Sequence, residues 1–238
     1  MFRSSFPLPF TRARGAFRGF AAAVCVAATL SFSSPATASL VQNAFANGSL
    51  NVTIERTGQS DQNVRAGGFT GVFAGSPFLS YCIELAQYFN FGVNYTNYTV
   101  VPLASAPTNS PMGATKAMHL ALLVGKNFTD SFTSTIKTAA MQLAIWEIVH
   151  ETNSTYSVTS GHFKVDDGSN DVNQARTLAN TWLGELSGLK TMASLVTLSS
   201  PTNQDFITTV VPVPPSALLL GSGLLLGMWG IRRRRTEA

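Results

Sequence analysis

The chain has 238 residues, of which 45% are hydrophobic and 12% are charged, and its formal net charge is +4. This composition excludes a disordered chain, because the apolar share is high and the net charge is small. Two cysteines allow at most one disulfide, which excludes a disulfide-rich scaffold. The length is sufficient for one domain with a real hydrophobic core.

The basic charge lies at the two ends of the chain, although the pI of about 9.3 describes the whole of it. Of the sixteen Lys and Arg residues, four precede residue 20 and four form the run 232–235. Residues 39–211 hold eight basic and eleven acidic side chains, a net charge of −3. Because this stretch is not basic, we expect no nucleic-acid binding.

The first 38 residues have the pattern of a secretory signal peptide. Four arginines within residues 1–18 precede a stretch of small apolar residues at 19–32, and Ala36 and Ala38 complete an A-x-A cleavage site. We expect signal peptidase to cut after Ala38. The alternative, a first transmembrane helix, would need about 20 apolar residues. Cys25 would leave with the signal, so the exported chain would keep Cys82 as its single cysteine.

The last 29 residues have the pattern of a membrane anchor. Residues 210–231 carry no charge, and the run Arg232, Arg233, Arg234 and Arg235 follows them. A segment of this length can cross a bilayer, and basic residues remain on the cytoplasmic side. The domain that precedes it would therefore be exported and attached to the membrane through its C-terminal helix.

The details of this segment resemble the PEP-CTERM sorting signal of Gram-negative bacteria. Val211, Pro212 and Pro214 form the short proline motif, and Val213 stands where the name-giving pattern has Glu, as in a VPxP variant. The resemblance implies that an exosortase-type enzyme processes the chain, which is anchored transiently and then reaches the cell surface or extracellular matrix. A permanent anchor is the alternative. The expected organisation is thus a signal peptide at 1–38, an extracellular domain at 39–209 and a sorting signal at 210–238.

Between these ends, the hydrophobic pattern predicts strands first and helices afterwards. Strands are expected at 49–56, 69–73 and 78–83, and a loop rich in Pro, Asn, Ser and Thr at about 101–113. Helices are expected at 114–124, 134–151 and 171–186, the last with Asp171 as its N-cap, and closing strands at 194–198 and 206–210. The expected fold class is α+β, a single domain in which strands flank a central helical block.

Two residues of this domain stand out chemically. Cys82 ends a strand-like run and, taken alone, is typical of a small buried hydrophobic residue. Gln142 lies on the expected helix 134–151, which is apolar nearly all round and should be buried. A buried amide must have its hydrogen bonds satisfied. Taken alone, Gln142 would therefore be a core glutamine that pairs with backbone.

Taken together, the two residues fit another chemistry, because a thiol can attack a glutamine amide, expel ammonia and leave an internal thioester. The segments around Cys82 and Gln142 resemble those of the thioester domains of bacterial surface adhesins. Glu84 stands where the adhesins commonly have Asp, and Met141 where they often have Thr. The resemblance covers about residues 50–185. It implies a Cys82–Gln142 thioester, and Tyr81 and Trp146 are our candidates for shielding it from water.

Such a domain would be a single-turnover covalent reagent and not an enzyme with turnover. It would attach to an amine-bearing surface protein or polysaccharide without a cofactor. Two alternatives remain open. The first is a non-catalytic structural protein of the extracellular polymeric matrix. The second is a cysteine hydrolase, in which Cys82 would pair with His119, His150 or His162.

The segment 166–171 is rich in oxygen ligands and contains a turn glycine, which is compatible with calcium binding. It lacks the spacing of an EF-hand and the terminal Glu. A polar turn that caps the third helix is the favoured interpretation, and we expect no metal site.

Overall fold

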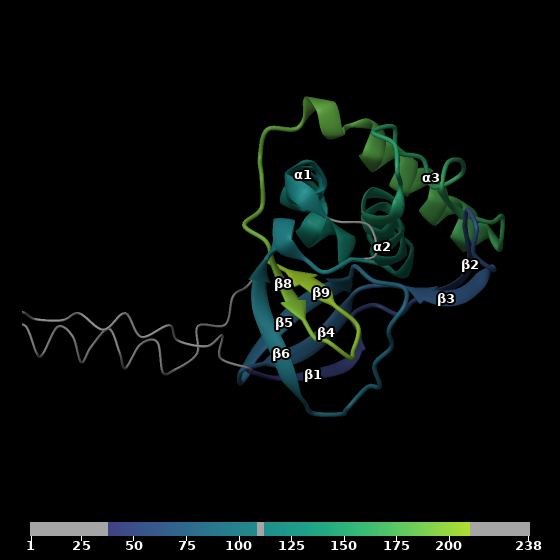
Figure 1. The fold of residues 1–238 in the computed structure, drawn as a ribbon. Helices are drawn as coiled ribbons and strands as arrows, with labels where there is room; N and C mark the ends of the chain where they lie inside the picture. The colour runs from purple at the N-terminus through teal and green to yellow at the C-terminus, as the bar shows by residue number, and fades with distance from the viewer. Residues whose placement is uncertain (1–37, 109–111, 210–238) are drawn as a thin grey trace, which may run out of the picture. The chain divides into compact units, whose positions relative to one another are not determined.

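The computed structural model describes residues 38–108 and 112–209 (Figure 1). It contains both helices and strands, which confirms the α+β class. The strands form a closed six-stranded barrel and a separate three-stranded sheet, an arrangement that is more specific than strands flanking a helical block. The predicted sorting signal and, apart from Ala38, the predicted signal peptide lie outside the described residues.

The barrel is antiparallel throughout and closes where its last strand in spatial order pairs with its first. Its strands follow in the order β1 (Ala38–Phe45), β4 (Phe69–Phe73), β5 (Ser76–Cys82), β9 (Phe206–Thr208), β8 (Val196–Ser199) and β6 (Tyr95–Pro102). Strands distant in the sequence are therefore neighbours. In particular, β9 pairs with β5, and Phe206 lies opposite Cys82.

The smaller sheet consists of β3 (Gln62–Ala66), β2 (Leu50–Arg56) and β7 (Phe163–Val165), with β2 in the centre. The alternation predicted for β2 is confirmed, because Val52 and Ile54 are buried on one face. The sequence patterns missed β1, β3, β6 and β7. Along β6 only Tyr98 is buried, so the hydrophobic alternation of this strand is weak. The strand is recognised only from its pairing with β1 and β8.

Three helices follow β6 in the chain: α1 (Gly113–Ser131), α2 (Thr135–His150) and α3 (Asn170–Gly184). Helix α1 is longer than predicted, because the buried positions of its last turns are the polar Asn127 and Ser131 and the apolar periodicity stops before them. The prediction of Asp171 as the N-cap of α3 is wrong. Ser169 caps this helix, and its hydroxyl accepts a hydrogen bond from the backbone N–H of Val172.

Helix α2 is the centre of the core. Every residue from Thr138 to His150 is buried, as its apolar composition predicted. The helix packs between α1 and α3 and also contacts β3, β5 and β7, and in Figure 1 the three helices lie together beside the strands. The Thr138 hydroxyl accepts a hydrogen bond from the backbone N–H of Gly68 at 2.8 Å, which fixes α2 against the start of β4. Two short 3₁₀ helices, Leu103–Ser105 and Leu186–Gly188, complete the regular structure.

Among the described residues, no helix has both the length and the apolar composition that crossing a membrane would require.

Candidate functional site

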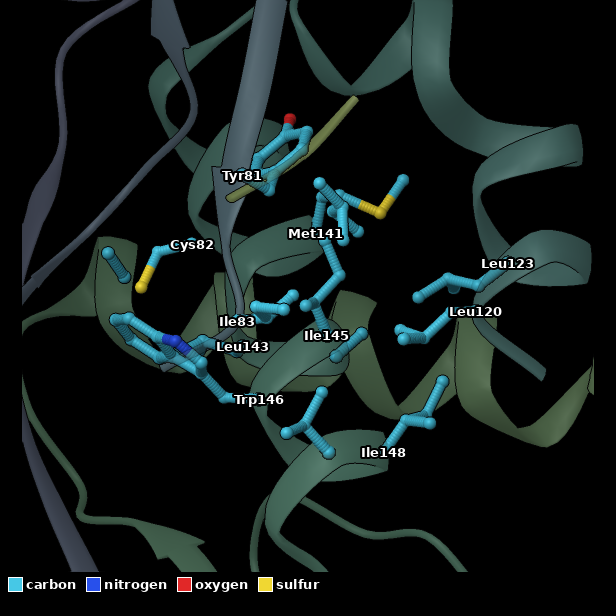
Figure 2. Close-up of a cluster of buried hydrophobic side chains, with 14 of the residues drawn as sticks. Tyr81, Cys82, Ile83, Leu120, Leu123, Met141, Leu143, Ile145, Trp146 and Ile148 are labelled. Atoms are coloured by element: carbon cyan, nitrogen blue, oxygen red, sulfur yellow. The ribbon is translucent and has the colours of Figure 1, made fainter. Parts of the chain in front are cut away.

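Cys82 is the last residue of β5 and is 1% exposed. It is a free cysteine. Because side chains alternate along a strand, Cys82 and the preceding Tyr81 point to different faces of β5. Figure 2 shows this divergence, with the Tyr81 ring directed away from the sulfur of Cys82.

The side chain of Gln142 contacts the main chain of Cys82. Its Oε1 accepts a hydrogen bond from the Cys82 backbone N–H at 3.0 Å, and its Nε2 donates one to the Cys82 carbonyl oxygen at 2.7 Å. Gln142 is fully buried, so both polar ends of its amide are satisfied by these bonds. This is the arrangement of a core glutamine that pairs with backbone. The structure therefore brings Gln142 and Cys82 together without pairing the amide with the thiol.

The amide beside the thiol belongs to Gln204. Its Nε2 donates to Cys82 Sγ at 2.6 Å and to the carbonyl oxygen of Glu84 at 3.0 Å. The Cys82 thiol in turn donates to the same Glu84 carbonyl oxygen at 2.7 Å, and the Glu84 backbone N–H lies 3.4 Å from the sulfur. The amide carbon of Gln204 is bonded directly to Nε2, so an electrophilic acyl carbon lies close to the Cys82 sulfur.

The barrel topology explains why Gln204 arrives at this position. Strand β9 pairs with β5 so that Phe206 faces Cys82, and the Ile83 backbone N–H donates to the Asp205 carbonyl oxygen at 3.1 Å. Continuing this register by two residues places Gln204 beside Glu84. The carbonyl oxygen of Gln204 accepts a hydrogen bond from the Tyr98 hydroxyl at 2.7 Å, which holds the residue from β6.

The loop between β8 and β9 is organised by the carboxylate of Asp205. This carboxylate accepts hydrogen bonds from the backbone N–H of Ser200 at 2.8 Å and from the Ser199 hydroxyl at 3.2 Å. The Ser200 hydroxyl accepts hydrogen bonds from the backbone N–H groups of Thr202 and Asn203. The loop that presents Gln204 is thus held by its own polar side chains.

The surroundings of the thiol oppose its ionisation. Burial raises the pKa of Cys82 to about 12, although the hydrogen bond from the Glu84 backbone and the nearby indole N–H of Trp146 act in the opposite direction. Burial, together with the charge of Asp205, raises the pKa of Glu84 to about 7, and burial raises the pKa of Asp205 to about 6. At neutral pH the free thiol is protonated, so a thiolate at this site depends on nearby hydrogen-bond donors.

A pocket of about 300 Å³ opens beside Cys82 and Gln204. Six of its thirteen lining residues are aromatic. Four phenylalanines among them contact one another, with ring centroids 4.9 to 5.2 Å apart. The lining residues are Phe45, Asn63, Val64, Arg65, Phe69, Cys82, Leu85, Gln87, Tyr88, Phe89, Phe91, Trp146 and Gln204. A small molecule or side chain that enters this pocket would meet the thiol and the Gln204 amide together.

The two residues predicted to shield the site occupy different environments. Trp146 is 2% exposed and lines the pocket with Cys82, and Figure 2 shows its indole ring next to the Cys82 side chain. The Tyr81 hydroxyl donates to Ser131 at 2.7 Å, and its ring packs against Phe128 and Phe132 of the α1 region. We therefore retain Trp146 and not Tyr81 as part of the site.

The histidines of the hydrolase alternative lie away from the thiol. His119 pairs with the Tyr156 hydroxyl at 2.8 Å, His150 stacks on Phe163, and the backbone N–H of His162 donates to the Glu151 carboxylate at 2.7 Å. None of the three lines the pocket beside Cys82. A Cys–His catalytic pair is not assembled in this arrangement.

The segment 166–171 uses its polar groups within the protein. Asp167 forms an ion pair with Arg176, and Ser169 caps α3. Within the described residues there is no cluster of three or more His, Cys, Asp or Glu side chains that could hold a metal ion. The described structure thus matches a helix-capping turn at this position.

Comparison with protein-family models, with curated proteins and with solved structures gives no match to this chain. The resemblances to the PEP-CTERM signal and to the adhesin thioester domains stay predictions. The residues of the predicted sorting motif, Val211, Pro212 and Pro214, and the tail 232–235 lie outside the described residues, as does Ala36. Ala38 is the first residue of β1.

The sequence analysis missed Gln204. It is one of seven glutamines, and its only local signal is its place just before the short apolar run 206–207. It is separated from Cys82 by 122 residues, and only the pairing of β5 with β9 makes them neighbours. Tyr98, which holds the carbonyl of Gln204, was missed for the same reason.

Proposed function

We propose that this protein is an exported surface or matrix protein that attaches covalently to amine nucleophiles through an internal thioester between Cys82 and Gln204. One observation carries the proposal: the 2.6 Å contact between Gln204 Nε2 and Cys82 Sγ beside an open pocket. The proposal replaces the predicted Cys82–Gln142 pair, because both ends of the Gln142 amide are engaged by the main chain of Cys82.

Formation of the thioester is an acyl transfer within the chain. The Cys82 sulfur attacks the side-chain amide carbon of Gln204, a C–S bond forms, the C–N bond breaks, and the thiol proton leaves with the nitrogen as ammonia. The departing nitrogen already donates a hydrogen bond to the Glu84 carbonyl oxygen. This contact gives the leaving group an acceptor on its way out of the site.

Opening of the thioester transfers the acyl group to a partner. An amine attacks the carbonyl carbon of Gln204, an amide bond to the partner forms, and Cys82 leaves as a thiolate that takes up the proton released by the amine. The reaction occurs once per molecule, because the amide product does not regenerate the thioester. The protein is therefore a covalent reagent and not an enzyme with turnover.

Gln142 has a positioning role in this proposal. It binds the N–H and the carbonyl oxygen of Cys82 from the buried helix α2 and so fixes the end of β5. The thiol is thereby held while the loop that carries Gln204 presents the amide. Two glutamines serve one cysteine, the first as a support and the second as the reactant.

The localisation is proposed from the sequence. A signal peptide at 1–38 and a sorting signal at 210–238 would direct export, transient anchoring and processing by an exosortase-type enzyme. A mature chain with Cys82 as its single cysteine has no second thiol that could exchange with the thioester. The target would be an amine-bearing surface protein or polysaccharide.

The alternative is a structural protein of the extracellular matrix that keeps this fold without the bond. The burial of Cys82 and its raised pKa favour this alternative, because they disfavour the thiolate that attacks. Both proposals account for the fold. They differ in the covalent state of Cys82, which a mass measurement decides.

The test is the intact mass of the full-length chain beside that of a Cys82→Ser variant. The proposal expects the wild-type chain to weigh one ammonia less than calculated and to gain one methylamine on treatment with that amine. The variant should show its full calculated mass and no addition. A full calculated mass in the wild type, with Cys82 open to alkylation after unfolding, would establish the structural alternative.

A further inference from the structure

Two polar atoms in the walls of the pocket have no hydrogen-bond partner. They are Nε1 of Trp146 and Oε1 of Gln87, and both are buried. Buried polar groups are normally paired, so each such atom calls for an explanation. One is a donor and the other an acceptor, and they share a pocket with Cys82 and Gln204.

The unpaired donor lies at the reacting sulfur. Trp146 projects from α2, and Figure 2 shows its indole ring next to the Cys82 side chain. Its N–H favours the thiolate and thus lowers the pKa of Cys82 against the larger effect of burial. A donor in this position is stronger toward a charged acceptor than toward a neutral one. It would therefore stabilise the sulfur most when the C–S bond breaks.

The unpaired acceptor belongs to a residue that lines the same pocket as the reacting amide. The Nε2 of Gln87 donates to the carbonyl oxygen of Pro201, in the loop that presents Gln204, at 3.3 Å. This bond fixes the Gln87 amide and leaves its Oε1 as an acceptor in the pocket wall. Because Gln87 and Gln204 both line the pocket, an entering N–H group would meet this acceptor in the same pocket as the amide carbon that it attacks.

The charges in the pocket select the form of the nucleophile. The lining contains no carboxylate, and its one cation, Arg65, lies over the Phe45 ring at 4.4 Å and donates to the Ser49 hydroxyl. An ammonium ion would therefore lose its hydration without gaining a counter-ion, at a large cost. An uncharged amine would need one acceptor, which Gln87 supplies.

We propose that this pocket binds the uncharged form of a primary amine on an apolar stem, with Gln87 Oε1 accepting an amine N–H and Trp146 Nε1 donating to the departing sulfur. The proposal rests on the proposed thioester. The amine nitrogen bonds to the Gln204 carbonyl carbon, the C–S bond breaks, and the amine proton passes to Cys82. Gln87 acts on binding and Trp146 on the transition state.

The test is the rate at which butylamine opens the thioester of the full-length chain, followed by intact mass over a range of amine concentrations and pH. The wild-type rate should saturate and should follow the concentration of uncharged amine. Gln87→Leu should raise the half-saturating concentration roughly tenfold with little change in the maximal rate. Trp146→Phe should lower the maximal rate roughly tenfold or more with little change in half-saturation.

The matched controls are Gln174→Leu, at an exposed position of α3, and Trp182→Phe, at a buried position of the same helix away from the pocket. Both should react like the wild type. Opening of all variants at the wild-type rate would overturn the subsite and leave the thioester intact. A wild-type chain of full calculated mass would overturn the thioester and the subsite together.

A second measurement covers the case in which Trp146→Phe forms no thioester. In a Gln204→Ala background the thiol stays free, and the pH profile of its alkylation reports on the thiolate. Trp146→Phe should move this profile to higher pH, because the thiolate loses a donor. A profile that does not move, or that moves to lower pH, would overturn the role of the indole N–H, because a loss of packing alone would admit water and lower the pKa of Cys82.

Discussion

Helix α2 and the loop before β9 each bring a glutamine to Cys82, and they do so through different atoms. Gln142 projects from a buried helix and binds both main-chain polar groups of Cys82. Gln204 lies in a loop that is held by the Tyr98 hydroxyl at its own carbonyl oxygen and by Gln87 at the Pro201 carbonyl oxygen. Its side chain contacts the sulfur of Cys82. The comparison shows two separate tasks. The buried helix α2 fixes the main chain of the reactive Cys82, and the loop before β9 supplies the amide that reacts with it at the edge of the pocket.

The largest expected effect follows from removing the loop glutamine. Gln204→Ala should abolish the loss of ammonia completely, because it removes the one side-chain amide that, among the described residues, donates a hydrogen bond to Cys82 Sγ. The fold should persist, because the residue is not part of the buried core. Intact mass and circular dichroism together measure this. Retention of the ammonia deficit in this variant would contradict the assignment of Gln204.

The helix glutamine should behave in the opposite way. Gln142→Leu leaves the buried N–H and carbonyl oxygen of Cys82 without partners and should lower the free energy of unfolding by about 2–4 kcal/mol. Denaturant unfolding measures this, and Gln174→Leu at an exposed site should stay within about 0.5 kcal/mol of the wild type. The folded Gln142→Leu protein should still lose ammonia. If Gln142→Leu kept the wild-type stability but no longer showed the ammonia deficit, Gln142 would be the reactant and not the support.

A smaller effect is expected where α2 meets β4. Thr138→Val removes the hydroxyl that accepts the Gly68 N–H at 2.8 Å and lies 3.2 Å from the Tyr81 hydroxyl. The buried N–H loses its acceptor, so the free energy of unfolding should fall by about 1–2 kcal/mol. Thermal unfolding checks the loss of stability. Thr138 belongs to helix α2, which supports Cys82 but does not supply the reacting amide. A slower thioester formation at an equal folded fraction would therefore show that the roles of α2 and of the Gln204 loop are not separable.

The smallest expected effect is a change in the pH dependence of the unfolding free energy, caused by Glu84. The pKa of Glu84 is raised from 4.5 to about 7 by burial and by Asp205. The protonated carboxyl therefore contributes stability that is fully present below pH 4.5 and is lost as the pH rises through 7. Glu84→Gln should reduce the fall in unfolding free energy between about pH 5 and about pH 8 by roughly 1 kcal/mol. An unchanged pH dependence would show that Glu84 titrates normally.

The sequence predicted those parts of the fold that have a local signal. Helix α2 and strands β2 and β4 were located within one or two residues, because a long apolar segment and strict alternation are visible in a short window. The barrel was not predicted, because its closure depends on the pairing of β1 with β6 and of β5 with β9. Such pairings join residues that no local pattern connects.

The candidate site was predicted in part for the same reason. Cys82 and Gln142 were selected on local grounds, and the structure brings them into contact. The choice of Gln142 as the reactant came from a resemblance between short segments, whereas the hydrogen bonds assign it to the main chain. Gln204 precedes a strand of three residues, and its polar loop resembles any other turn until β9 is placed beside β5.

The most direct test of the account is to find which glutamine carries the acyl group. The full-length chain is treated with isotopically labelled methylamine, digested, and its peptides sequenced by mass spectrometry. The account predicts that the label appears on Gln204 alone, as a methylamide, with one equivalent per chain and none in the Cys82→Ser variant. A label on Gln142 would contradict the central claim by making the buried helix, and not the loop, the source of the acyl group.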